Sequence, residues 1–186
     1  MDIAQAQADV RRIYSNGWRG PAVSAVVWLV AAVLTDNVGI GLGAAVLFVG
    51  GALLIFPLNL LFNKLTTGQA DLPAGHPMRG LAVQVAMNMV AALLAAWAIS
   101  TVLPSAFFPL AMVVAGAHYL PFAHLYGERF FLVAAIVETV AGLLILVNDT
   151  SVSLGGYVMA ALLAAQAVGL FLRHRSRRES PAPATT

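Results

Sequence analysis

The sequence contains no cysteine and few charged residues, and both absences narrow what the protein can be. Without cysteine, disulfides, thiolate metal sites and cysteine catalysis are excluded. Asp, Glu, Lys and Arg make up only 10% of the 186 residues, whereas they make up about a quarter of an average soluble domain. Hydrophobic residues reach 60%. This composition is typical of an integral membrane protein.

Six long apolar runs account for most of the chain, and they predict its fold. We place them at residues 21–36, 38–62, 81–103, 106–126, 130–147 and 152–172. A run of about 20 apolar residues crosses a bilayer as a helix. The predicted fold is therefore all-α, a polytopic membrane protein with six transmembrane helices over residues 21–172.

The two ends of the chain are polar enough to lie outside the membrane. Residues 1–20 are expected to form a cytoplasmic N-terminal segment, either as a helix lying on the membrane surface or as a frayed terminus. Residues 173–186 are basic at first and then rich in Pro and Ala. We expect them to form a disordered cytoplasmic tail.

The distribution of basic residues predicts the topology. All ten Lys and Arg residues fall before the first run, after the sixth, or in the alternate loops 63–80 and 127–129. Because basic residues are retained on the cytoplasmic side during insertion, both termini are expected inside, and we expect the protein in a bacterial cytoplasmic membrane. Attraction to anionic lipid headgroups accounts for the basic balance. Membrane lipids are thus expected partners, and nucleic acid is not.

Similar segments in three of the runs suggest an internal repeat. Residues 30–34, 90–94 and 140–144 resemble one another, and Trp28, Asn88 and Glu138 precede them at the same offset. The pattern indicates three helical hairpins repeated in parallel orientation, although runs rich in Ala and Val also match by chance. Small residues four apart, such as Gly39 and Gly43, favour close helix packing in lipid.

Glu138 is the most informative polar residue at membrane depth, because a carboxylate there is costly unless it is protonated or paired. Ala134 and Gly142 flank it at helical spacing, so it is expected to face neighbouring helices. His118 and Glu138 lie about equally far from the hairpin tip near Gly127, which places them at similar depth. A direct or water-mediated contact between them is predicted, but spacing does not show whether the side chains face each other.

Other polar residues gather in the half of the bundle that we expect to face the cytoplasm. Two interpretations are open: they line a cavity that opens to the cytoplasm, or they are amides that only bridge helices. Under the first interpretation, the candidate ligand-binding or proton-binding residues are Glu138, His118, Asn88, Gln166, Asn59, Tyr119 and His124.

No catalytic constellation is recognisable, and the sequence does not favour an enzyme. His118 and His124 are six residues apart, about 240° around a helix, so they cannot share a metal ion from one straight helix. We therefore predict no metal site, and the sequence identifies no cofactor. No lysine lies within any of the six runs, which argues against a retinal Schiff base.

Two neighbouring segments carry a family resemblance. Residues 116–122, Gly-Ala-His-Tyr-Leu-Pro-Phe, and residues 126–131, Tyr-Gly-Glu-Arg-Phe-Phe, are similar to an uncharacterised family of small six-span bacterial membrane proteins. The resemblance implies a six-span plan for nearly the whole chain. It implies no activity and no catalytic residues.

Three function classes follow from these observations. The first is binding or transport of a small molecule or ion through an inward-facing polar cavity, with a proton link through Glu138 and His118. The second is a structural or accessory membrane protein. The third is an intramembrane enzyme that acts on lipid, with His118, His124 and Glu128 near the inner headgroups. The size of the chain is compatible with a homodimer.

Overall fold

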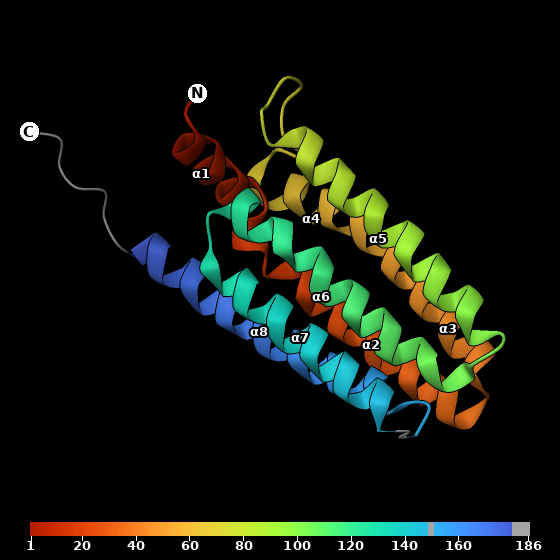
Figure 1. Cartoon of the computed structure of the whole chain (residues 1–186). Helices are drawn as coiled ribbons and strands as arrows, with labels where there is room; N and C mark the ends of the chain where they lie inside the picture. The colour runs from red at the N-terminus through yellow and green to blue at the C-terminus, as the bar shows by residue number, and fades with distance from the viewer. Residues whose placement is uncertain (149–150, 180–186) are drawn as a thin grey trace, which may run out of the picture.

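Six long helices form an elongated bundle in the computed structural model of the chain (Figure 1). The structure describes residues 1–148 and 151–179. The helices are α1 (Ile3–Ile13), α2 (Arg19–Asn37), α3 (Ile40–Phe48), α4 (Ile55–Thr67), α5 (Arg79–Ser100), α6 (Phe107–Tyr126), α7 (Arg129–Val147) and α8 (Leu154–Glu179). Six helical stretches are long and apolar enough to cross a membrane. The predicted all-α, six-span fold is confirmed, and the chain is a multi-pass membrane protein.

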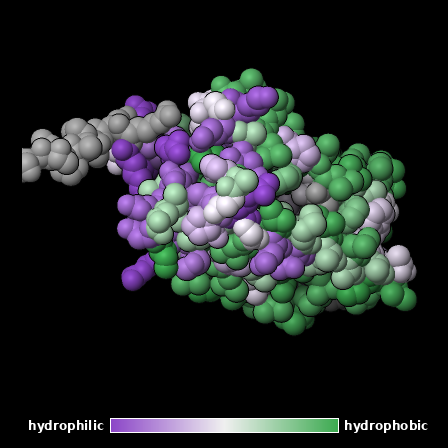
Figure 2. Space-filling model, turned by 90° about the horizontal axis from the view of Figure 1, so that it is seen from above, coloured by the Kyte–Doolittle hydropathy of each residue, from purple (hydrophilic) through white to green (hydrophobic). Residues whose placement is uncertain are grey.

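One end of the bundle is strongly basic. The helices α2, α5 and α7 begin there, at Arg19, Arg79 and Arg129, and α4, α6 and α8 end there. We call it the basic end. Figure 2 shows hydrophilic residues gathered at this end, beside the grey trace, and hydrophobic residues over most of the remaining visible surface. Its position relative to the cytoplasm, like the three-hairpin repeat, stays a prediction.

The helices approach one another closely at small residues. The most extensive contacts join α6 to α7 and α2 to α8. A Cβ atom at Gly43 would collide with Thr35 of α2, and one at Gly142 would lie 2.8 Å from the carbonyl oxygen of Pro109 on α6. Both glycines belong to seams predicted from residue spacing. In lipid, such close backbone approach replaces the hydrophobic effect as the force that joins helices.

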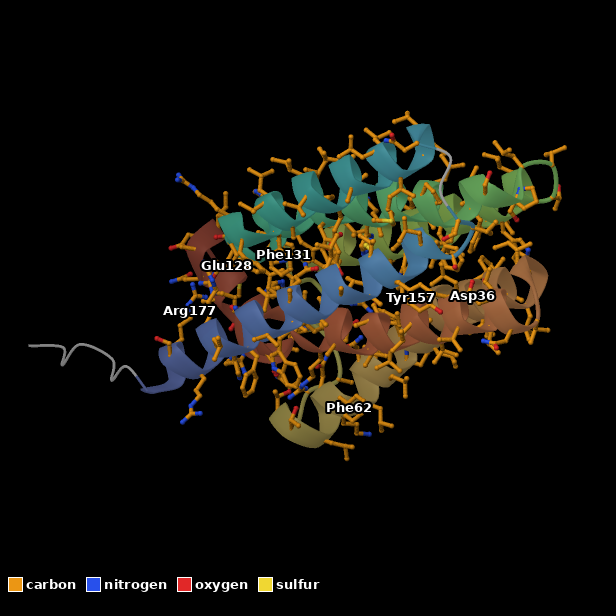
Figure 3. The ribbon with its side chains drawn as sticks, turned by 90° about the horizontal axis from the view of Figure 1, so that it is seen from below. Asp36, Phe62, Glu128, Phe131, Tyr157 and Arg177 are labelled. Atoms are coloured by element: carbon orange, nitrogen blue, oxygen red, sulfur yellow. The ribbon has the colours of Figure 1, made fainter. Side chains whose placement is uncertain are left out.

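Two helices continue further than their hydropathy indicates. The second run ends at Thr67 rather than at residue 62, and α8 reaches Glu179. Residues 173–179, predicted to be disordered, are therefore helical, whereas residues 180–186 lie outside the described part of the chain. The polar last turns of α8 have protein partners: Arg173 lies 3.4 Å from Glu128, and Arg177 also pairs with Glu128 (Figure 3).

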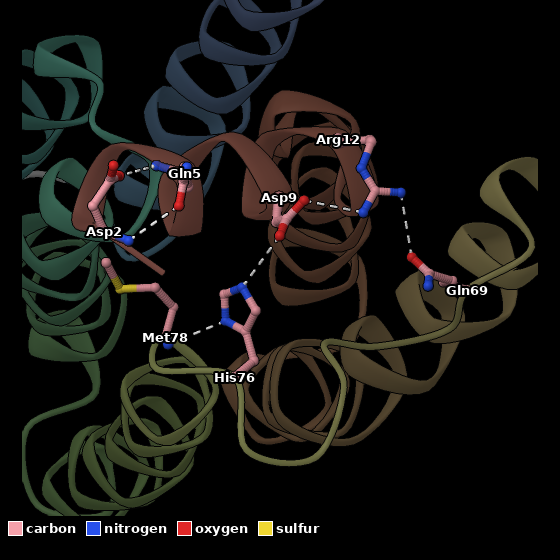
Figure 4. A network of polar contacts seen from close by, with 7 residues as sticks. All are labelled: Asp2, Gln5, Asp9, Arg12, Gln69, His76 and Met78. Atoms are coloured by element: carbon pink, nitrogen blue, oxygen red, sulfur yellow. Dashed lines mark hydrogen bonds and ion pairs between the residues drawn. The ribbon is translucent and has the colours of Figure 1, made fainter.

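The N-terminal helix α1 covers the basic end of the bundle. A capping box between Asp2 and Gln5 starts it, and its apolar face is buried. Figure 4 shows how its polar face holds the loop between α4 and α5: Asp9 Oδ2 lies 3.8 Å from His76 Nε2, and Arg12 donates to Gln69 at 3.4 Å. Of the two alternatives left open for this segment, the structure has the helix, and its apolar face packs on the protein.

Candidate functional site

A cavity of about 200 Å³ lies among α2, α4, α5 and α6, in the half of the bundle nearest the basic end. Its lining comes from every one of these helices, with additions from the N-terminal segment and α7. The lining residues are Tyr14, Gly17, Gly20, Pro21, Ser24, Gly51, Ile55, Phe56, Asn59, Leu60, Asn63, Ala82, Ala86, Met89, Val90, His118, Tyr119, Phe122, Leu125, Tyr126 and Phe131.

A break in the second membrane helix shapes one wall of the cavity. A π-helical segment, Val49–Leu54, joins α3 to α4, and Gly51 at its centre lines the cavity. Gly50 approaches α2 so closely that a Cβ atom there would lie 2.5 Å from Val27 Cγ1. Pro57 follows within one turn and has no N–H to donate along the helix. Such π-helical turns are uncommon and often lie at functional sites.

Aromatic rings form the opposite wall, and most of them come from the two segments that carry the family resemblance. The ring of Phe131 stacks 5.5 Å from Phe122 and lies 4.9 Å from Tyr126. The His118 ring meets the Phe122 ring edge-on at 4.9 Å. Because these rings are large and interlocked, they give the cavity a rigid apolar surface.

The cavity lining contains no Asp, Glu, Lys or Arg. Its polar groups are hydroxyls, amides and one imidazole. Burial, and then a hydrogen bond to Asp71, raise the pKa of Tyr14 above its ordinary value, so this phenol is neutral at physiological pH. The cavity therefore offers hydrogen bonds without a full charge.

Several of these polar groups have hydrogen-bonding capacity to spare. His118 Nδ1 finds no partner among the described residues. The hydroxyls of Tyr119 and Tyr126 hydrogen-bond to no other described residue. In contrast, Asn63 is committed to the protein, since it receives a bond from Arg19 at 3.3 Å and donates to the Ala70 carbonyl at 3.3 Å.

The N-terminal segment closes the cavity toward the basic end. Tyr14 and Gly17 line that end, and the Tyr14 hydroxyl donates to Asp71 in the loop before α5. The segment is held in place by Gln7, which donates to the His124 carbonyl at 2.7 Å, and by Arg11, which donates to the Tyr126 carbonyl. These bonds hold the segment across the side of the cavity that faces the basic end.

The side wall of the cavity, between α4 and α5, is thinner than the cover at the basic end. The helix α4 packs on α2, α1 and the π-helical segment rather than on α5. A second hollow, of about 460 Å³, lies between α4 and α5. Four side chains line both this hollow and the cavity: Phe56, Leu60, Ala86 and Val90. These four side chains therefore form a wall that the two spaces share.

Three of the seven predicted site residues line the cavity: His118, Tyr119 and Asn59. Glu138 and Gln166 are buried, at 1% and 4% exposure, but they lie outside the lining. Neither the carboxylate oxygens of Glu138 nor the amide atoms of Gln166 have a hydrogen-bond partner among the described residues. The predicted direct contact between His118 and Glu138 is therefore not formed.

The remaining two predicted residues point away from the cavity. His124 and Asn88 are exposed, and neither belongs to the lining. Residues that the prediction missed include Ser24 and Gly51. For Gly51 a signal exists in the sequence, since the pair Gly50-Gly51 followed by Pro57 marks a helix that cannot stay regular.

The sequence comparisons place the chain with one family. The model of a family of unknown function, DUF7010, matches residues 3–173. No curated protein and no solved structure matches the chain.

Proposed function

Because the chain belongs to DUF7010, whose function is unknown, we propose its function from the cavity: the protein binds a small uncharged molecule among α2, α4, α5 and α6. The proposal rests on a lining that has hydrogen-bonding groups but no charged side chain. A charged ligand would lose its hydration there without gaining a counter-charge. An uncharged ligand with an apolar body would bury that body against the aromatic wall. The sequence left open whether the ligand is a small molecule or an ion, and the uncharged lining favours a small uncharged molecule.

We further propose that the ligand reaches the cavity from the bilayer. The cover formed by α1 and Tyr14 closes the basic end, while the wall between α4 and α5 consists of a few side chains. The neighbouring residues Leu53, Val83 and Met87 are 53%, 44% and 59% exposed and line the outer hollow. A molecule dissolved in lipid therefore meets this wall directly.

The charge distribution supports an orientation for this site. With the basic end in the cytoplasm, as expected for a protein of a bacterial cytoplasmic membrane, the cavity lies in the inner half of the bilayer. Ligands would then be collected from the inner leaflet.

Filling the cavity is expected to abolish binding. Ala82 lines the cavity but not the outer hollow, so Ala82→Phe places a ring in the space of the ligand. The probe is a photoactivatable benzyl alcohol that carries a diazirine, and labelled peptides are mapped by mass spectrometry. Labelling of cavity peptides should fall about tenfold or more, which corresponds to about 1.4 kcal/mol of binding free energy. Ala98→Phe, exposed on the same helix and outside both linings, is the matched control. Equal labelling in the two variants would refute the site.

Blocking the side wall is expected to slow access from the bilayer. Since the chain has no cysteine, Leu60→Cys provides a single thiol on the wall, which is alkylated after folding with a bulky maleimide. A long-chain fatty alcohol that carries a diazirine, held in phosphatidylcholine vesicles, should label cavity peptides before alkylation and much less after it. Leu61→Cys, beside it but outside both linings, should show no change. If the benzyl alcohol labels the cavity and the long-chain alcohol does not, binding stands and lateral access is wrong.

A further inference from the structure

Two amide side chains on α5 face outward at membrane depth. Gln84 and Asn88 are exposed, and neither side chain hydrogen-bonds to another described residue. Asn88 lies nine residues after Arg79, the first residue of α5, which places it about 13 Å along the helix at 1.5 Å per residue. A side chain as short as asparagine cannot reach the headgroups from there.

Lipid gives these amides nothing to bond with. An unsatisfied amide in hydrocarbon costs several kcal/mol, and polar side chains within membrane spans therefore usually face protein. The described neighbours of α5 are α6, α3, the π-helical segment and the turn before α6. They leave the face with Gln84 and Asn88 exposed, and neither residue lines the cavity or the outer hollow.

Small residues continue the same face toward the far end of α5. Ala91 and Ala95 are exposed and follow Gln84 and Asn88 at spacings of three and four residues, so all four lie on one side of the helix. Small side chains let another helix approach closely, and amides then bond across the contact. We call Gln84, Asn88, Ala91 and Ala95 the amide face.

We propose that the amide face is the interface of a homodimer, in which α5 packs in parallel against α5 of a second copy. All copies insert in the same orientation, so a twofold axis along the membrane normal brings each residue of this face opposite the same residue at the same depth. An amide carries both donors and an acceptor, so Asn88 can bond with its own counterpart. Self-complementarity of this kind favours a second copy over an unrelated partner. The inference does not depend on the cavity.

Disulfide trapping in the membrane tests the interface. Ala91→Cys introduces the only cysteine of the chain and leaves both amides in place. Val140→Cys, 47% exposed on α7 and eleven residues from the basic end of its helix, is the matched control at a similar depth. A twofold contact brings the two introduced sulfur atoms within bonding range, since Cβ atoms in a disulfide lie about 4 Å apart. Mild oxidation should therefore give a disulfide-linked dimer with Ala91→Cys and only collisional background with Val140→Cys.

The amides themselves are tested by replacing them with leucine. In Ala91→Cys, the added changes Gln84→Leu and Asn88→Leu should reduce cross-linking to the level of the Val140→Cys control. An independent test that uses no cross-linker is single-molecule photobleaching in vesicles. Wild type should bleach in two steps per fluorescent spot, and the Gln84→Leu, Asn88→Leu variant in one step. Thermal unfolding checks that the variant is folded. Equal cross-linking of both cysteine variants, cross-linking that survives the leucines, one-step wild type, or an adduct with a different protein would each overturn the homodimer.

Discussion

Replacing Gly116 by alanine is expected to destabilise the protein by about 1–3 kcal/mol, and replacing it by leucine should prevent α6 and α7 from packing. A Cβ atom at Gly116 would lie 2.8 Å from the backbone nitrogen of Thr139 and 2.9 Å from the carbonyl oxygen of Ala135. Both are main-chain atoms of α7, so no side-chain rotation relieves the clash. Because α6 and α7 form the most extensive helix contact of the bundle, the strain cannot be absorbed locally.

A second glycine provides the control for this prediction. Gly41 lies in α3 with no atom within 4 Å of its Cβ position, so Gly41→Ala should leave stability unchanged or raise it by up to about 1 kcal/mol through helix propensity. Thermal unfolding in detergent, followed by tryptophan fluorescence, measures both variants. If Gly116→Ala unfolds at the temperature of wild type, the two helices have room to separate and the close seam is not essential.

The membrane fold could be predicted from the sequence because lipid imposes one strong condition. Every backbone N–H and C=O in the bilayer needs an internal partner, so long apolar runs become helices. The ends of those helices were less predictable, since hydropathy does not register partners that polar residues find in the folded protein. The helix α8 extends through Arg173 and Arg177 because Glu128 lies beside them. The local sequence does not predict that pairing.

Depth within the membrane could be predicted, but the direction of each side chain could not. His118 and Glu138 were placed at similar depth by counting residues from the hairpin tip. Gly116, however, provides the close contact with α7, and successive residues turn by about 100° around a helix. His118, two positions further, therefore faces away from α7, toward the cavity and the Val85 backbone of α5. Recognising Gly116 as the residue in contact with α7 would have indicated that His118 does not face Glu138.

The candidate residue Asn88 shows the same limitation on another helix. Its polarity and depth indicated an inward site, but α5 has its packed face elsewhere, and Asn88 is exposed. In a soluble protein an exposed amide needs no explanation. In a membrane span it does, and the same residue that fails as a cavity ligand becomes the strongest sign of a protein partner.

Replacing Glu138 by methionine is expected to stabilise the protein by about 1–3 kcal/mol, the usual cost of a buried polar group without a partner. Glu138 is 1% exposed, and both of its carboxylate oxygens lack hydrogen bonds among the described residues. Methionine has a similar length and adapts its shape to irregular cores, so little packing is lost. Glu138→Gln should gain less, because an unsatisfied amide remains. Thermal unfolding of the two variants beside wild type gives the comparison.

The same variants decide what Glu138 does for the cavity. Glu138 is buried but lies outside the lining. If the cavity binds an uncharged molecule without help from a proton site, labelling by the photoactivatable benzyl alcohol should be the same in Glu138→Met and in wild type. A Met variant that is less stable would show that the carboxyl has a stabilising partner. A Met variant that is more stable but loses labelling would show that the carboxyl serves the cavity. The proton-linked function predicted from the sequence would then replace simple binding, since a carboxyl kept at a stability cost is kept for its chemistry.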